Sequence, residues 1–345
     1  MKKIMDKLRY KIRSRWKTYF RQKKQQTIRK RILSYYAQHP PEDPEIQEAV
    51  GYLSEHPLTT FYGSFQEKYQ ADQVKVYTDP LNGLPYVMAE GKKLFFKRSH
   101  NRRTVQLLYN ALRTEQDPDA PHCYTDPDFQ IREGDILADV GSAEGYLSLL
   151  HIEKLKRAYL FEQDSEWVEA LEATFAPWRE KVVIVPAFVS DRNDNDHVSL
   201  DHYFLQHPEK PDFYKIDVEG AEASVLEGMK EMLRKKPVKI ALCTYHHQGD
   251  FEIFSRFFAQ NGFSYRPNPG AMIFQKCFSR YALFHNNWSL NNWSIFIGEG
   301  NMLLKNQNWF FAMNAILIIE CNYINLNIVI GVWALVFPGF LGKGT

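Results

Sequence analysis

ILADVGSAEGYL, residues 136–147, joins a short apolar strand to a glycine turn and the start of a helix. The strand ends near Asp139, and Gly141 and Gly145 lie in the loop that leads into the helix. Glycine adopts backbone conformations that strain other residues, so the chain can turn sharply and approach a ligand closely. The first turn of a helix also offers unpaired N–H groups and a positive dipole end. The stretch therefore predicts a ligand-binding turn in an α/β protein.

Strand and helix patterns alternate around this turn. The predicted strands are Ile136–Val140, Ala158–Glu162, Val182–Pro186, Phe213–Asp217 and Val238–Cys243. The predicted helices between and after them cover residues 144–155, 165–178, 221–234 and 250–261. Strands that are apolar along their whole length are typical of a parallel sheet with helices on both faces. The string FSYRPNPGAMIF, residues 263–274, predicts an antiparallel hairpin at the sheet edge.

The glycine turn differs from the GxGxxG turn that cradles the pyrophosphate of a dinucleotide. Here Asp139 precedes Gly141, and a carboxylate at that place repels phosphate but attracts an ammonium group. S-adenosylmethionine carries such a group. We therefore interpret Asp139, Gly141 and Gly145 as contacts of this cofactor, with a helix-capping turn in some other α/β protein as the alternative.

Acidic residues after the next two strands extend this hypothesis. Glu162 ends the second predicted strand, where a carboxylate can accept hydrogen bonds from both ribose hydroxyls. Asp191 follows the third strand and is a candidate contact of the adenine amino group. For both residues the alternative is a solvated polar loop.

The string DFYKIDVEGAEASVLEGM, residues 212–229, places two carboxylates at the end of the fourth predicted strand. Asp217 and Glu219 are two residues apart, so both project from one face of an extended chain. Open α/β sheets bind their ligands at this end of the strands. Asp217 is thus a candidate for facing the methyl donor or acting as general base, or the pair holds a divalent cation. Helix capping by the two acids is a third interpretation.

Two histidines follow the fifth predicted strand, in the string CTYHHQGD at residues 243–250. Neutral imidazole is available near pH 7, so either ring can take a proton from a hydroxyl group. We regard His246 as a catalytic candidate beside Asp217, with a histidine pair that has no role as the alternative.

Together these motifs resemble the FkbM-like family of S-adenosylmethionine-dependent methyltransferases. The resemblance rests on Asp139-Val-Gly-Ser-Ala-Glu-Gly145, Tyr159-Leu-Phe-Glu162 and Lys215-Ile-Asp-Val-Glu-Gly-Ala-Glu222. It extends through residues 115–117, 121–122, 174–182 and 244–246 and covers roughly residues 45–276. It looks like a subgroup found with polysaccharide-building enzymes.

The resemblance implies a class I methyltransferase-like α/β fold, with a mostly parallel seven-stranded sheet and a final antiparallel strand. It implies O-methylation of a sugar, glycan or small-molecule hydroxyl. It also implies cofactor contacts at Asp139, Gly141, Gly145 and Glu162, and a place for Asp217 and Glu219 at the active-site floor. An NAD-dependent Rossmann oxidoreductase and a non-catalytic membrane-surface binding protein are the alternative functions.

Charge divides the 345 residues into unlike parts: residues 1–31 have a net charge of +13, residues 32–276 of −12 and residues 277–345 of +1. We expect four segments. They are a basic helical arm at 1–37, an accessory helix and hairpin segment at 38–133, a cofactor-binding Rossmann-like domain at 134–276 and an atypical Asn/Trp-rich tail at 277–345.

The basic arm predicts one long helix over residues 1–36, because Ile4, Leu8, Ile12 and Trp16 recur on one face. The prolines in HPPEDPEIQ, residues 39–47, stop it, and a second helix runs from there to about Glu55. A basic amphipathic helix suits an anionic membrane surface. A solvated or protein-docked helix is the alternative, and nucleic acid is disfavoured.

The last 69 residues contain five charged residues, against 79 in the first 276. We therefore hypothesise that the tail is a foreign or out-of-frame extension that replaces the usual C-terminus. Residues 324–341 are mostly apolar and reach the lower length limit of a membrane span.

The four cysteines have no CxxC spacing, and no apolar signal segment follows the first lysines. Both observations favour a cytoplasmic protein, with the arm at the inner face of the membrane.

Overall fold

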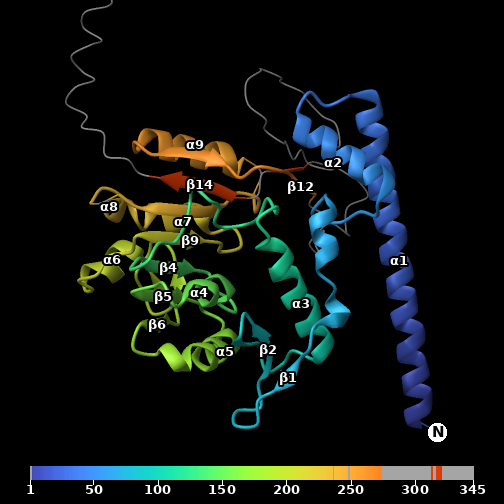
Figure 1. Ribbon diagram of the computed structural model, residues 1–345, viewed down its shortest axis with the longest axis horizontal. Helices are drawn as coiled ribbons and strands as arrows, with labels where there is room; N and C mark the ends of the chain where they lie inside the picture. The colour runs from blue at the N-terminus through green and yellow to red at the C-terminus, as the bar shows by residue number, and fades with distance from the viewer. Residues whose placement is uncertain (1, 236, 248, 274–311, 314–315, 321–345) are drawn as a thin grey trace, which may run out of the picture.

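The computed structural model describes residues 2–235, 237–247, 249–273, 312–313 and 316–320 (Figure 1). The mostly apolar stretch at 324–341 lies outside these residues. Among the helices that are described, none combines the length and the apolar character that a membrane crossing needs.

A seven-stranded sheet forms the centre of the molecule, in the order β11-β14-β10-β9-β4-β5-β6. The five strands from β10 to β6 are parallel, as predicted. β14 runs antiparallel to both of its neighbours. The strands are β4 (Ile136–Val140), β5 (Arg157–Phe161), β6 (Val182–Val185), β9 (Phe213–Ile216), β10 (Lys239–Cys243), β11 (Ser264–Pro267) and β14 (Ile316–Glu320). The chain order reverses between β4 and β9, which is where sheets of this kind bind ligands.

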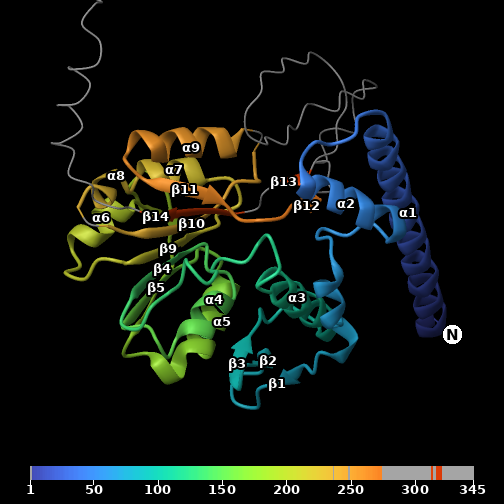
Figure 2. The same cartoon turned by 45° about the horizontal axis from the view of Figure 1, so that its top comes forward.

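Helices cover both faces of this sheet, so the sheet has two separate cores (Figure 2). Alternate residues of a strand point to opposite faces. Leu137 and Phe213 pack with residues of α3, α4 and α5, whereas Ala138 and Tyr214 pack with residues of α6 to α9. The helices are α3 (Arg102–Glu115), α4 (Tyr146–His151), α5 (Ser165–Phe175), α6 (Leu200–Leu205), α7 (Glu222–Glu227), α8 (Lys230–Leu233) and α9 (Asp250–Gln260).

The hairpin predicted at residues 263–274 is wrong. β11 pairs with β14, and β12 (Met272–Ile273) pairs with β13 (Ala312–Met313). The strand pattern in 263–274 is real, but its hydrogen-bonding partners come from far along the chain. Both partner strands lie in the segment 277–345, and its interpretation as a foreign extension stays a prediction.

The single helix predicted at 221–234 is two helices, α7 and α8. Gly228 separates them, and a Cβ at this position would lie 2.1 Å from the carbonyl oxygen of Ser190. This close approach fixes the break against the loop after β6. That loop holds a short parallel pair, β7 (Phe188–Val189) and β8 (His197–Val198), which the sequence did not predict.

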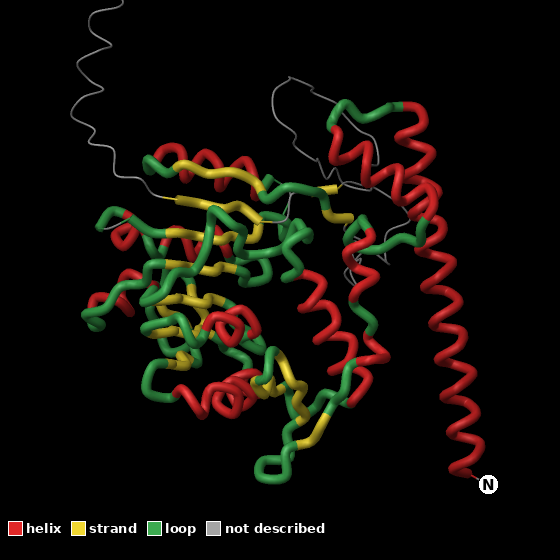
Figure 3. Tube along the Cα trace, viewed as in Figure 1, coloured by secondary structure: helices red, strands yellow, loops and turns green. Residues whose placement is uncertain are grey.

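The accessory segment contains a small antiparallel sheet, which confirms the predicted hairpins (Figure 3). Two contacts join this sheet and the loop after it to α5. The N–H of Phe95 donates to Thr174 Oγ1 at 3.0 Å, and Arg98, in the loop, pairs with Glu169 at 2.5 Å. The small sheet is thereby fixed beside the central one. Its strands are β1 (Tyr77–Thr78), β2 (Pro85–Ala89) and β3 (Lys92–Phe95); the 3-10 helices are η1 (Ser64–Lys68), η2 (Ala71–Gln73) and η3 (Ala176–Trp178).

The basic arm is one helix, α1 (Lys2–Gln38), and α2 (Pro44–Glu55) packs against its C-terminal part (Figure 1). Both helices were predicted. Asp43 caps α2 by accepting hydrogen bonds from the first backbone N–H groups, and Pro44 supplies a residue that needs no such partner.

The contact between α1 and α2 is apolar at its centre and polar at its edge. Ile28 and Ile32 are buried with Leu53. Arg29 donates to the carbonyl oxygens of Leu53 and Ser54 at 2.7 and 2.5 Å, which satisfies acceptors at the end of α2. The direction of α1 relative to α2 is therefore set by side-chain packing.

We expect Ile32→Ala to lower the free energy of unfolding by about 2–4 kcal/mol, because it removes a buried side chain and leaves a cavity. Ile32 is only 6% exposed. Lys30→Ala, an exposed change on the same helix, is the control and should shift stability by less than about 0.5 kcal/mol. Urea denaturation measures both, and equal effects would contradict the packing described.

Candidate active site

A cavity of about 650 Å³ opens at the carboxyl ends of β4, β5 and β9, at the reversal of strand order. Its volume suits a small-molecule site. Its charged lining residues are mostly acidic: Glu115, Asp139, Glu144, Glu162, Asp164, Asp217 and Glu219, against Lys97 and Lys215. Both lysines pair with carboxylates of the protein. The cavity therefore attracts cations and repels anions.

Gly141 and Gly145 shape the predicted turn, and both have a φ of 74°. A Cβ at residue 141 would lie 2.0 Å from the carbonyl oxygen of Asp217, so only glycine lets this loop meet the end of β9. A Cβ at residue 145 would lie 2.8 Å from Leu171 and Phe175 of α5. Gly141 lines the cavity, whereas Gly145 packs against α5 and is not among the lining residues.

Asp139 is buried and already has partners within the protein. Its Oδ2 accepts a hydrogen bond from Ser148 at 2.6 Å, and its Oδ1 lies 3.3 Å from Nζ of Lys215. Lys215 also donates to the carbonyl oxygen of Gly141. Burial alone would lower the pKa of this ammonium group, but Asp139 and Asp217 outweigh it and raise the pKa. Asp139 is thus the counterion of Lys215. Lys215 was not among the site residues predicted from the sequence.

Glu162 lies just beyond β5 and lines the cavity, and its role as a cofactor contact stays a prediction. Its Oε2 accepts from the N–H of Ala143 at 2.9 Å, and its Oε1 from the N–H of Asp164 at 2.8 Å. A carboxylate has about four acceptor positions, so both oxygens can accept a further hydrogen bond from a ligand.

Asp191 is not brought together with the other predicted residues. It is exposed and accepts a hydrogen bond from the hydroxyl of Ser224 in α7, which lowers its pKa. The cavity wall after β6 consists instead of Ala187, Phe188 and Val189. The sequence could not show that this loop is fixed to α7.

Asp217 and Glu219 do not project from one strand face, because β9 ends at Ile216 and Glu219 has a φ of 55°. The Glu219 side chain is 92% exposed and that of Asp217 only 19%. Tyr124 donates its hydroxyl to Asp217 at 2.8 Å. Burial by itself would raise the pKa of Asp217, but Lys215, His122 and His246 together lower it. Asp217 is therefore held as an ion.

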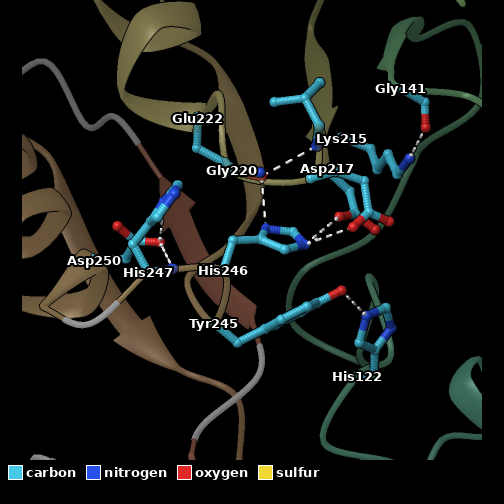
Figure 4. Close-up of polar contacts among 12 residues, drawn as sticks. His122, Gly141, Lys215, Asp217, Gly220, Glu222, Tyr245, His246, His247 and Asp250 are labelled. Carbon is cyan, nitrogen blue, oxygen red and sulfur yellow. Dashed lines mark hydrogen bonds and ion pairs between the residues drawn. The ribbon is translucent and has the colours of Figure 1, made fainter. Parts of the chain in front are cut away.

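His246 lies between these acids and Glu222, the first residue of α7 (Figure 4). Its Nδ1 is 2.8 Å from Glu222 Oε1, and its Nε2 is 3.7 Å from Asp217 and 3.6 Å from Glu219. Burial lowers the pKa of the ring, but the ion pair with Glu222 and the other two acids raise it above the usual value. Glu222 is fully buried and was not predicted as a site residue.

We predicted that Asp217 and Glu219 hold a metal ion together, but Glu219 belongs to neither group of possible ligands in the described residues. Among the described residues, ligand atoms of Asp217, Glu222 and His246 lie within 4.8 Å of one another, and so do those of His122, Asp217 and Cys243. Lys215 and His246 already compensate the buried carboxylates. Cys123 and Cys243 are buried free thiols, and Cys277 and Cys321 lie outside the described residues.

Glu144 is a further lining residue that the sequence interpretation did not single out. Burial raises its pKa to about 7, so it is partly protonated near neutral pH. The signal in the sequence was an acid inside the glycine turn itself, between Gly141 and Gly145.

Residues 110–265 match the family model described as the methyltransferase FkbM domain. This range contains every predicted site residue from Asp139 to His246. No curated protein matches the chain.

Solved structures similar to the chain include a methyltransferase FkbM from Methylobacillus flagellatus KT, with 15% identity and a TM-score of 0.36. The match covers 50% of this chain and 50% of that one, so the chain spans about half of its length. An rRNA methylase from Streptococcus thermophilus has 13% identity, a TM-score of 0.31 and coverage of 55% and 87%. A Streptococcus pneumoniae protein in complex with S-adenosyl-L-methionine has 17% identity, a TM-score of 0.33 and coverage of 56% and 70%.

We expect Gly141→Ala to lower the free energy of unfolding by about 2–4 kcal/mol, because it adds backbone strain and a clash with the backbone of Asp217. Gly134→Ala is the matched control: its φ is 83°, but nothing lies within 4 Å of its Cβ position. That variant should lose only about 1 kcal/mol. If thermal denaturation gives equal losses, the close approach of the two strand ends is wrong.

Proposed function

We propose, from the premise that residues 110–265 are a methyltransferase FkbM domain, that the protein transfers a methyl group from S-adenosylmethionine to a neutral hydroxyl group. The observation that carries this proposal is the acidic cavity at the carboxyl ends of β4, β5 and β9. A sulfonium donor has two positive groups, and such a cavity attracts both.

The residues around the cavity fit this cofactor. Glu162 can accept hydrogen bonds from ribose hydroxyls at the tip of β5, and Gly141 lets the backbone approach the ligand. Asp139 offers negative charge beside Lys215, and a ligand ammonium would share it. When bound, the cofactor supplies an activated methyl group on a positively charged sulfur. What the protein adds is orientation, exclusion of water and a place for the acceptor's proton.

The alternative of a dinucleotide cofactor fits less well. A pyrophosphate needs a cluster of N–H donors or cations at the first strand. In this structure the N–H of Ala143 is donated to Glu162, and Lys215 is paired with Asp139. The two negative phosphates would then lie among carboxylates without a free positive group from these residues.

The acidic lining of the cavity also limits the chemical class of the methyl acceptor. A phosphate-rich acceptor such as RNA would meet the acidic lining residues at close range, and like charges there cost free energy. A sugar, glycan or other uncharged hydroxyl compound meets no such penalty. We therefore favour a neutral hydroxyl acceptor in polysaccharide or small-molecule modification.

Binding of S-adenosylhomocysteine tests the cofactor. At about 100 times its dissociation constant, it should stabilise the protein by about 2.7 kcal/mol and raise the melting temperature, whereas NAD should not. Glu162→Gln should weaken binding by about ten- to a hundredfold, since it removes charge-assisted hydrogen bonds to the ribose. Asp191→Asn is the control and should bind like the wild type. Stabilisation by NAD alone would contradict the proposal.

Transfer of a labelled methyl group to neutral glycosides, lipid-linked sugars and RNA tests the acceptor. We expect label on the neutral compounds. Label on RNA alone would contradict the charge argument.

We propose further that α1 holds the protein at an anionic membrane surface. Support comes from its charge: 14 of the first 31 residues are Lys or Arg, and Tyr19 and Phe20 are more than half exposed. Aromatic and basic side chains on one helix suit a lipid headgroup region. Packing of Ile28 and Ile32 on α2 leaves the basic N-terminal part as the segment that reaches the surface.

Charge reversal at three arm lysines, Lys3→Glu, Lys7→Glu and Lys11→Glu, should weaken binding to phosphatidylserine-containing liposomes at least tenfold. Each lysine near such a surface contributes about 1 kcal/mol. A matched triple change at the exposed Lys75, Lys154 and Lys235 keeps the same net charge and should bind like the wild type. Equal sedimentation of the two variants would remove the membrane role of α1.

A further inference from the structure

Glu222 and His246 form a carboxylate–imidazole pair that lies behind Asp217 and Glu219, two residues that line the cavity. Glu222 is 0% exposed and its Oε1 accepts hydrogen bonds from the N–H groups of Val218 and Gly220 at 3.1 and 3.4 Å. The same oxygen lies 2.8 Å from Nδ1 of His246. The carboxylate is thus fixed by backbone donors, and its contact with Nδ1 is an ion pair when the ring is protonated.

The other ring nitrogen of His246 faces two acids that line the cavity. Nε2 lies 3.7 Å from Oδ1 of Asp217 and 3.6 Å from Oε2 of Glu219 (Figure 4). Both distances exceed a hydrogen bond, so neither acid occupies this nitrogen. They are short enough for one oxygen atom to contact Nε2 and a carboxylate at once. An acceptor hydroxyl at that point reaches a nitrogen that can take its proton.

We propose that His246 is the general base of methyl transfer and that Glu222 is the positioning residue that holds its ring. The proposal rests on the methyltransferase function proposed above and names the proton acceptor within it. As the acceptor oxygen bonds to the methyl carbon of the donor, the carbon–sulfur bond breaks with its electron pair on sulfur. The hydroxyl proton moves to Nε2, and the imidazolium later releases it to water.

Asp217 is a poorer base than His246. Its pKa is lowered, and Tyr124 already donates to Oδ2. A base works best when its pKa is near the operating pH. Asp217 instead stays negative beside Nε2, where it stabilises the imidazolium that forms.

The charged groups near His246 in the described structure are acidic: Glu222 on α7, Asp217 and Glu219 on the loop after β9, and Asp250 at the start of α9. The ring of Tyr245 packs against the imidazole at a centroid distance of 4.4 Å. Burial opposes the acids, yet the pKa of His246 is raised. The neutral, basic form therefore appears only as pH rises through a value above the usual imidazole pKa of about 6.5. The transfer rate should rise over the same range.

Proton NMR of the imidazole resonances tests the pair without any acceptor, with His246→Gln used to assign the signal. We expect the wild-type His246 pKa to lie above that of a free imidazole. Glu222→Gln should lower it, because the amide keeps an oxygen for the two backbone N–H groups but loses the charge. A pKa that this substitution leaves unchanged would overturn the proposal.

Methyl transfer to the best neutral glycoside then tests the base itself. His246→Gln should reduce kcat by about 10²–10⁴-fold. Glu222→Gln should reduce kcat less and should shift the rise of kcat with pH to lower pH values. The control is His247→Gln, whose ring is 62% exposed and pairs with Asp250, and its pH profile should match the wild type. All variants should still bind S-adenosylhomocysteine; failure of the wild type to bind it would refute the proposed function instead.

If His246→Gln kept the wild-type kcat and the wild-type dependence of kcat on pH, the proposal would be overturned. So would loss of activity with EDTA that Mg²⁺ or Mn²⁺ restores, because Nε2 would then be a metal ligand.

Discussion

The buried ammonium group of Lys215 constrains everything around the cavity. A charge taken out of water is tolerated only with close opposite charge and hydrogen-bond partners. Asp139 and the carbonyl oxygen of Gly141 supply these from β4 and its loop, while Lys215 itself belongs to β9. The two strands at the reversal of chain order are thus joined by charge as well as by backbone pairing. The turn after β4 can be close to β9 only because residue 141 has no side chain.

Once Lys215 has neutralised part of the acidity, the remaining carboxylates have distinct roles. Glu162 faces the cavity from β5, and Asp217 is kept ionised by its cationic neighbours and Tyr124. Glu222 lies behind the wall and acts on His246. Equivalent side chains thus differ in function because their burial and their nearest partners differ.

The elements that could be predicted from the sequence are those that depend on a local pattern of residues. Apolar strand runs, proline stops and the glycine turn correctly placed the five parallel strands, α1 and α2. Prediction failed where distant segments decide the outcome. The pairing of Glu222 with His246 joins α7 to the loop after β10, and no spacing in the chain announces it. Asp217 and Glu219 were misplaced because the strand ends one residue early, where backbone N–H groups turn toward Glu222.

The position of β14 has a consequence for how the chain folds. It lies between β10 and β11, and within the described residues β11 pairs with no other strand of the sheet. Residues 316–320 are therefore needed before the edge strand can join at all. While the chain is being synthesised, β10 presents an open edge until they emerge from the ribosome, and such edges invite wrong partners.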